Sequence, residues 1–259
     1  MPEGSNFENH ETPPQPTEFL GRLKHDQETT PSKVDFESIL EKGEIESVRE
    51  LEGYWGMKLV EIKDGGDALF RPDKETDFIF EAKRMEARRS DLELMAYKVD
   101  QVLGFDLVPA VVNRTIGQHV GSLQRRIQNF SCVIWGTNWE NRVRPEEITR
   151  AAIFDYLLDV RDRHVGNFII DSDTGKLWLI DHDFFMFFDE IIKIKIIEKA
   201  QEKGLVILGG AERVSIERFL AHADSLTVDA KPEIVEIIKK ARDRAEILLK
   251  KGQIPITNA

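Results

Sequence analysis

Residues 157–183 read LLDVRDRHVGNFIIDSDTGKLWLIDHD, and this stretch decides the fold and the chemistry that we predict. A helical pattern ends near Asp159, a polar loop follows, and two short apolar runs flank a turn at Asp-Thr-Gly. We therefore predict a hairpin over 167–181. Asp162 and Asn167 share the tight loop before it, and the two-stranded ribbon can bring Asp181 to the same edge.

Such a set of side chains suits phosphoryl transfer. One carboxylate must accept or orient the proton of a hydroxyl group, and hard oxygen ligands must hold magnesium against a triphosphate. Asp162 suits the first role, and Asn167 and Asp181 suit the second. Aspartate and asparagine are also common in ordinary turns, so the loop by itself leaves a purely structural explanation open.

The rest of the chain divides into a strand-rich half and a helix-rich half. Strand-like runs at 57–62 and 67–71 flank an Asp-Gly turn at Asp64 and Gly65, and helical periodicity covers 81–103 up to Gly104. Two further strand-like runs, LVPAVVNRTI and HVGSLQRRI, come next, and 129–145 resembles a connector. Helices dominate after that, and we predict them over 146–160, 188–203, 214–223 and 231–251.

This order of elements predicts an α+β fold with two lobes and a cleft between them. Residues 1–34 are rich in polar residues and proline, so we expect a disordered tail. Residues 35–128 are expected to form a small β-rich N-lobe, and residues 129–259 a helical C-lobe that carries the catalytic loop.

Composition narrows the classes of partner. With 47 acidic against 36 basic residues, the formal net charge is −11, which disfavours non-specific binding to nucleic acid or anionic membranes. One cysteine, Cys132, precludes an intramolecular disulfide and fits a reducing compartment. The N-terminus lacks the pattern of a signal peptide, and no run is long and apolar enough for a membrane span. We therefore expect a cytoplasmic protein.

The pattern D-R-H-x-x-N, followed by a strand that ends in I-D-H, resembles the phosphatidylinositol 3/4-kinase-like superfamily. It is similar to the small bacterial members and to the related Golgi secretory-pathway kinases. The resemblance implies a two-lobed protein-kinase-like fold that uses ATP with Mg²⁺ or Mn²⁺. It implies that Asp162 and His164 act in catalysis, His164 often by supporting the loop, and that Asn167 and Asp181 bind metal.

A second part of the same pattern lies upstream, in ALFRP and SDLELMAYKVDQVLGFDLVPAVVNRTI. In the family, a strand lysine contacts the ATP phosphates and pairs with a helix glutamate. Those positions correspond to Arg71 and Glu93. The run GSLQ at 121–124 resembles the strand that leads to the adenine-binding hinge, which makes Gln124 a candidate contact.

Two features of this upstream part have a second explanation. Gly53 and Gly56 suit a loop whose N–H groups face phosphates, and they equally suit an ordinary turn. Arg71 keeps the positive charge of the usual lysine but forks its donors differently, and Lys74 or Lys83 could take over its role.

We therefore predict an ATP-dependent phosphotransferase that moves the γ-phosphate to a hydroxyl group of a protein or a small molecule. A degenerate kinase that works as a scaffold, or an AMP-transferase on the same fold, is the first alternative. The second alternative is a metal-dependent hydrolase. Its ligands would be Asp162, His164, Asp181, His182 and Asp183.

Overall fold

The computed structural model describes residues 33–51, 56–73, 86–128, 130–132, 138–182 and 195–255. Contacts divide the chain into two units, Met1–Pro31 and Ser32–Ala259, and every described residue lies in the second. The predicted disordered tail therefore lies outside the described residues up to position 32, and its last two residues begin a helix. The boundaries of the predicted lobes stay predictions.

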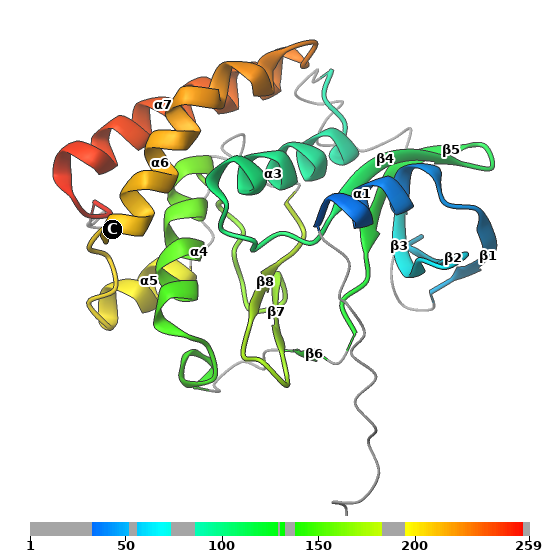
Figure 1. The fold of residues 1–259 in the computed structure, drawn as a ribbon, viewed down its shortest axis with the longest axis horizontal. Coiled ribbons are helices and arrows are strands. Elements are labelled where there is room, and N and C mark those ends of the chain that lie inside the picture. Colours follow the sequence, from blue (N-terminus) through cyan, green and yellow to red (C-terminus); the bar gives the residue numbers. More distant parts are fainter. Residues whose placement is uncertain are drawn as a thin grey trace, which may run out of the picture. The chain divides into compact units, whose positions relative to one another are not determined.

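The first half of the second unit is built around a five-stranded antiparallel sheet (Figure 1). Its strand order is β1-β2-β3-β5-β4, so β3 lies at the centre. The elements of this half are α1 (Lys33–Lys42), β1 (Ile45–Glu50), β2 (Lys58–Ile62), β3 (Gly66–Pro72), α3 (Arg89–Leu103), β4 (Val111–Ile116) and β5 (His119–Arg125).

The predicted hairpin between β2 and β3 is confirmed, with a change in its turn. Ile62 pairs with Gly66, and the left-handed φ angles, 57° and 75°, fall on Asp64 and Gly66. Aspartate and glycine tolerate such angles. Gly65 does not adopt a left-handed φ angle. Glycine suits this position for a different reason, because a Cβ there would overlap the side chain of Ile39 in α1.

Helix α3 begins at Arg89, and residues 81–85 of the helix predicted over 81–103 lie outside the described residues. Residues 86–88 precede the helix, and the N–H groups of Glu86 and Ala87 donate to the carboxylate of Glu233 at 2.8 and 3.2 Å. The N–H of Arg88 donates to Asp91 Oδ2 at 2.9 Å, which caps the first turn of the helix. The predicted stop is confirmed, since Gly104 caps the helix with a left-handed φ of 69°.

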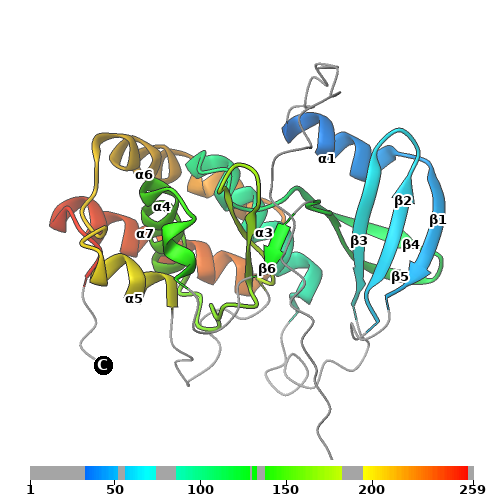
Figure 2. The ribbon, with the colours of Figure 1, turned by 90° about the horizontal axis from the view of Figure 1, so that it is seen from below.

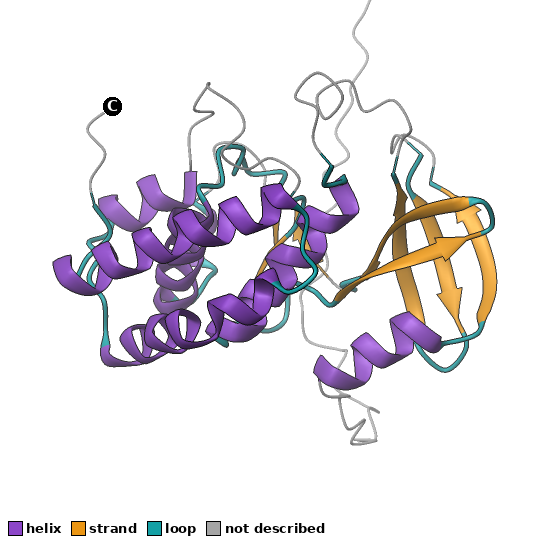
Figure 3. Ribbon diagram, turned by 90° about the horizontal axis from the view of Figure 1, so that it is seen from above, coloured by secondary structure: helices purple, strands orange, loops and turns teal. Residues whose placement is uncertain are grey.

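Helices dominate the second half (Figures 2 and 3). Its elements are β6 (Phe130–Cys132), η1 (Trp139–Asn141), α4 (Pro145–Leu158), β7 (Phe168–Asp171), β8 (Leu177–Leu179), α5 (Lys195–Glu202), α6 (Gly210–His222), η2 (Ala223–Thr227) and α7 (Pro232–Lys251). The prediction of a plain connector after β5 is wrong at β6, which pairs with β7. A three-residue strand is too short to show a periodicity. Of the helix predicted over 188–203, residues 188–194 lie outside the described residues.

None of the described helices is both long and apolar enough to cross a lipid bilayer. The cytoplasmic location stays a prediction.

Within the described residues, one large hydrophobic core runs from the five-stranded sheet through α3 into the helical half. Phe70 of β3, Tyr97 of α3 and Phe154 of α4 are completely buried in it. Most of the other core residues are Leu, Ile, Val and Ala, whose burial adds further apolar area. Because this core is continuous, strands of the first half and loops of the second half are held at fixed positions.

A buried ion pair anchors the loop that follows α4. The side chains of Arg163 and Asp155 are both fully buried, with Arg163 Nη2 3.0 Å from Asp155 Oδ1. Arg163 Nη1 also donates to the carbonyl oxygens of Asn167, at 2.7 Å, and Ile180, at 2.9 Å. One guanidinium therefore connects helix α4, the loop and both strands of the β7–β8 hairpin.

Burial raises the pKa of the Asp155 carboxyl above its ordinary value, and the Arg163 guanidinium beside it works in the opposite direction. Two buried charges are stable together only when each compensates the other and their remaining hydrogen-bonding groups are filled. Arg163 meets that condition with five hydrogen bonds to four acceptor atoms.

We predict that Arg163→Met lowers the free energy of unfolding by about 3–5 kcal/mol, because it leaves the Asp155 charge buried without a partner. Lys63→Met is the matched control. It removes an exposed ion pair with Glu44, at 2.9 Å, and should cost no more than about 1 kcal/mol. Urea denaturation followed by circular dichroism measures both.

Removing both charges, in Arg163→Met combined with Asp155→Leu, should recover part of the lost stability. If Arg163→Met and Lys63→Met cost the same, the buried pair is not the anchor of this loop.

Candidate active site

The loop after α4 holds the predicted catalytic residues Asp162 and His164 next to the predicted metal ligand Asn167. Asn167 Nδ2 donates to the backbone carbonyl of Asp162 at 2.6 Å, and Asn167 N–H donates to the carbonyl of His164 at 3.0 Å. Asn167 is buried, whereas Asp162 and His164 are partly exposed. The carboxamide of Asn167 thus holds the loop closed and keeps its own Oδ1 available as an oxygen ligand.

The ring of His164 faces the carboxylate of Asp162. The N–H of Gly166 donates to His164 Nδ1 at 2.9 Å, so the proton of the neutral ring lies on Nε2. Nε2 lies 3.9 Å from Asp162 Oδ1. A Cβ at Gly166 would lie 2.8 Å from the ring carbon Cε1, so glycine is needed for this ring position. The ring of His164 therefore lies next to the Asp162 carboxylate, at a distance longer than a hydrogen bond.

Asp181 ends the hairpin in a left-handed conformation. Its φ is 60°, a value that aspartate tolerates and that Asp64 also adopts. The next residue, His182, is completely buried and packs edge-on against Phe154 of α4. Its N–H donates to Glu93 Oε1 at 2.9 Å, and its Nδ1 lies 3.3 Å from Glu93 Oε2. Helix α3 therefore holds the backbone directly after Asp181.

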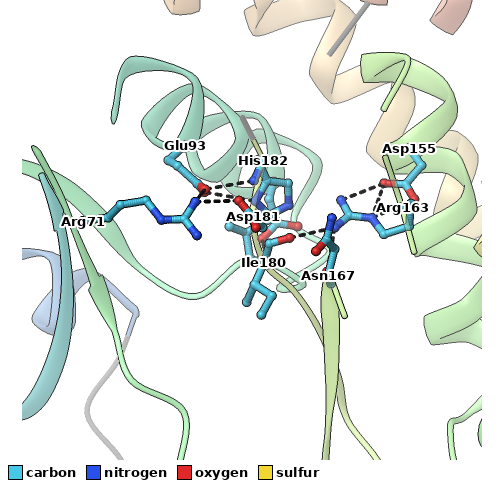
Figure 4. Close-up of polar contacts among 10 residues, drawn as sticks. Arg71, Glu93, Asp155, Arg163, Asn167, Ile180, Asp181 and His182 are labelled. Atoms are coloured by element: carbon cyan, nitrogen blue, oxygen red, sulfur yellow. Dashed lines mark hydrogen bonds and ion pairs between the residues drawn. The ribbon is translucent and has the colours of Figure 1, made fainter. Parts of the chain in front are cut away.

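Arg71 extends from β3 toward both of these carboxylates (Figure 4). Its Nη1 lies 2.6 Å from Asp181 Oδ1 and 3.9 Å from Glu93 Oε1. The sequence led us to expect a pair between Arg71 and Glu93. In the structure the shorter contact is the one to Asp181, which joins the sheet to the end of the hairpin.

Beside Arg71 lies a cavity of about 200 Å³. Polar residues of the prediction line it together: Arg71, Glu93, Gln124 and Asp181. Its other lining residues are Met57, Leu69, Val111, Ser122, Gly166 and Ile180.

The remaining predicted site residues lie around this cavity or outside the described residues. Asp162, His164 and Asn167 are not lining residues, but they share a short loop with Gly166, which is one. Gly56 is exposed, has a left-handed φ of 78° and directly precedes the lining residue Met57. Gly53, Lys74, Lys83 and Asp183 lie outside the described residues.

Sequence reasoning missed the apolar wall of the cavity, although strand register carries the signal. Leu69 of β3 and Val111 of β4 both pair with Gln124 of β5, so the three form one row across the sheet. Arg71 pairs with Ser122 in the next row on the same face. Side chains two residues apart on a strand share a face, so recognising Arg71 indicates Leu69, whereas Val111 also requires the register of β4 on β5.

A close approach of two strands fixes the position of Arg71. Gly121 of β5 pairs with Pro72, and a Cβ at Gly121 would overlap the carbonyl oxygen of Arg71 and lie 2.7 Å from Pro72 Cα. Glycine therefore lets β3 and β5 approach closely at the edge of the cavity.

The donor set fits a hard divalent cation that is held jointly with phosphates. The carboxylate of Asp181 and the carboxamide oxygen of Asn167 are the kind of ligand that Mg²⁺ takes when substrate phosphates complete its coordination. Among the described residues, no group of three or more His, Cys, Asp or Glu could hold a metal ion. The metal-hydrolase alternative stays a prediction, because Asp183, one of its ligands, lies outside the described residues.

Comparison with known proteins bears on fold and family. Residues 117–203 match the family model described as phosphatidylinositol 3- and 4-kinase. The crystal structure of the Golgi casein kinase is similar at a TM-score of 0.53 and 15% identity, over 84% of this chain and 73% of that chain. The structure of that kinase with Mn/ADP bound is similar at a TM-score of 0.52 and 15% identity, over 84% of this chain and 74% of that chain. No curated protein sequence matches the chain.

The matched residues 117–203 include the loop around Asp162 and the whole β7–β8 hairpin. The structural similarity extends over both halves of the described chain, with strands first and helices second. The chain therefore has a two-lobed kinase-like fold, with a β-rich N-lobe and a helical C-lobe, and its resemblance to the phosphatidylinositol 3/4-kinase-like superfamily is confirmed.

Proposed function

We propose that the chain binds ATP with Mg²⁺ or Mn²⁺ in the cavity beside Arg71 and transfers the γ-phosphate to a hydroxyl group of a protein or a small molecule. One observation carries the proposal. A cationic side chain from β3 and a carboxylate from the end of the hairpin converge at one cavity, 2.6 Å apart, on a kinase-like fold. A solved structure of similar fold has Mn/ADP bound, which supports the choice of ligand.

The cavity offers separate surfaces for the two ends of a nucleotide. Leu69, Val111 and Met57 form an apolar wall for the adenine ring, and the carboxamide of Gln124 lies beside that wall as a hydrogen-bonding group. Arg71 lies in the next row of the same sheet face, where its guanidinium can fork onto phosphate oxygens.

Asp181 and Asn167 would hold the metal ion through their side-chain oxygens. When bound, the ion neutralises negative charge on the phosphates. Asp162 takes the proton of the acceptor hydroxyl as its oxygen bonds to the γ-phosphorus, while the bond from the γ-phosphorus to the bridging oxygen breaks and ADP leaves. His164 lies beside this carboxylate, with Nε2 3.9 Å from Asp162 Oδ1, and would support its orientation.

The contact between Arg71 and Asp181 favours one other function, a nucleotide-binding scaffold without transfer activity. A guanidinium on the metal-facing carboxylate is an arrangement that could permit nucleotide binding while hindering turnover. The two functions differ in one measurable property, the formation of ADP by the wild-type protein.

We predict that the wild-type protein binds ATP in the presence of Mg²⁺ and that Asp181→Ala loses this binding, because the variant lacks the main metal ligand. Asp173→Ala is the matched control. It removes the same charge from the exposed turn of the same hairpin, outside the cavity, and should bind as the wild type does. Isothermal titration calorimetry measures all three. Absence of binding to the wild-type protein would contradict the proposal.

We also predict that Asp162→Asn lowers the rate of ADP formation by about 10²–10⁴-fold, as expected when a general base is removed. Its affinity for ATP should stay close to that of the wild type, because Asp162 does not line the cavity. A coupled ADP assay beside calorimetry separates the two effects. An equal loss of turnover and of binding would remove Asp162 from the catalytic role.

A further inference from the structure

The guanidinium of Arg71 takes the place on Asp181 that the proposed metal ion needs. Arg71 Nη1 lies 2.6 Å from Asp181 Oδ1, and both side chains are largely shielded from water, at 23% and 33% exposure. We propose that Arg71 is an internal counter-ion of Asp181, which a divalent cation can displace only when nucleotide phosphates draw the guanidinium away. This inference rests on the proposed function.

Charge explains why metal alone should bind weakly. A guanidinium keeps its positive charge at every pH at which the protein is folded. At 2.6 Å it neutralises the carboxylate of Asp181 and takes up its Oδ1 atom. A divalent cation that approaches Asp181 therefore meets a like charge and has to break a charge-assisted hydrogen bond.

Glu93 keeps its place when Arg71 moves. Its Oε1 accepts the N–H of His182 at 2.9 Å, and its Oε2 lies 3.3 Å from the His182 ring. The carboxylate is 6% exposed, so it cannot turn to solvent without breaking these contacts. With the guanidinium gone, the carboxylates of Glu93 and Asp181 both give the cavity a negative potential that attracts a cation.

Nucleotide phosphates can replace the hydrogen-bond acceptor that Arg71 would lose on leaving Asp181. Arginine binds phosphate with two parallel N–H bonds, so a diphosphate in the cavity can replace Asp181 as its partner. Transfer of the guanidinium to the phosphates leaves Asp181 Oδ1 open to metal. Nucleotide and metal then each raise the affinity for the other by the same factor, as linkage between two binding sites requires.

The test is the binding of Mn²⁺ alone, with ADP absent, to the wild-type protein and to Arg71→Gln. We expect Arg71→Gln to bind Mn²⁺ about tenfold more tightly, within the usual range of such couplings. Saturating ADP should raise the Mn²⁺ affinity of the wild type by a larger factor than that of the variant. Isothermal titration calorimetry, or the electron paramagnetic resonance signal of free Mn²⁺, gives these affinities without any assay of activity.

Arg126→Gln is the matched control, because Arg126 makes an equally short ion pair with Asp67, at 2.6 Å, and does not line the cavity. It removes the same charge and should leave Mn²⁺ affinity unchanged. Arg71→Met repeats the test should Arg71→Gln fail to fold. Adding Asp181→Asn to either Arg71 variant should abolish the gain.

The outcomes separate this inference from the proposed function. Equal or weaker Mn²⁺ binding by Arg71→Gln, with ADP still bound, overturns the inference alone. An equal gain in Arg126→Gln also overturns it, because the effect would then be one of net charge. If neither the wild type nor Arg71→Gln binds Mn²⁺ or ADP under any condition, the proposed function is wrong and the inference is wrong with it.

Discussion

The buried guanidinium of Arg163 is the constraint on which the candidate site depends. A cation without access to water is stable only where acceptors surround it. Here the acceptors come from Asp155 on α4 and from the carbonyl oxygens of Asn167 and Ile180, on the two sides of the hairpin. The hydrogen bonds of the Arg163 guanidinium therefore fix the path of the loop after α4 and the position of Asp181 at the end of the hairpin. The geometry of the candidate site follows from a residue that is not a lining residue of the cavity.

The charges around the cavity are arranged for a ligand that carries both signs. Glu93 and Asp181 present carboxylates, and Arg71 lies between them with its cation. A metal–triphosphate complex brings a cation for the carboxylates and anionic oxygens for the guanidinium. In the ligand-free protein the same groups satisfy one another. This explains how a site with several charges in a partly buried position can remain stable before it binds anything.

Much of the fold could be predicted because its signals are local. The turn at Asp64 and the stop at Gly104 each depend on a few neighbouring residues. The features that were missed depend on distant partners. The contact from Arg71 to Asp181 joins residues 110 positions apart, and β6 is recognisable as a strand only through its pairing with β7. For the site, the family pattern indicated Arg71, Glu93 and Asp181, but which two lie closest is a property of the packed structure.

The most direct test of the account is a crystal structure of the protein with ADP and Mn²⁺. We predict the diphosphate between Arg71 and Asp181, the adenine ring against the wall formed by Leu69 and Val111, and Mn²⁺ on the oxygens of Asp181 and Asn167. We also predict that the guanidinium has moved from Asp181 to the phosphates. A nucleotide bound at another surface, or an empty cavity at saturating ADP and Mn²⁺, would contradict the account.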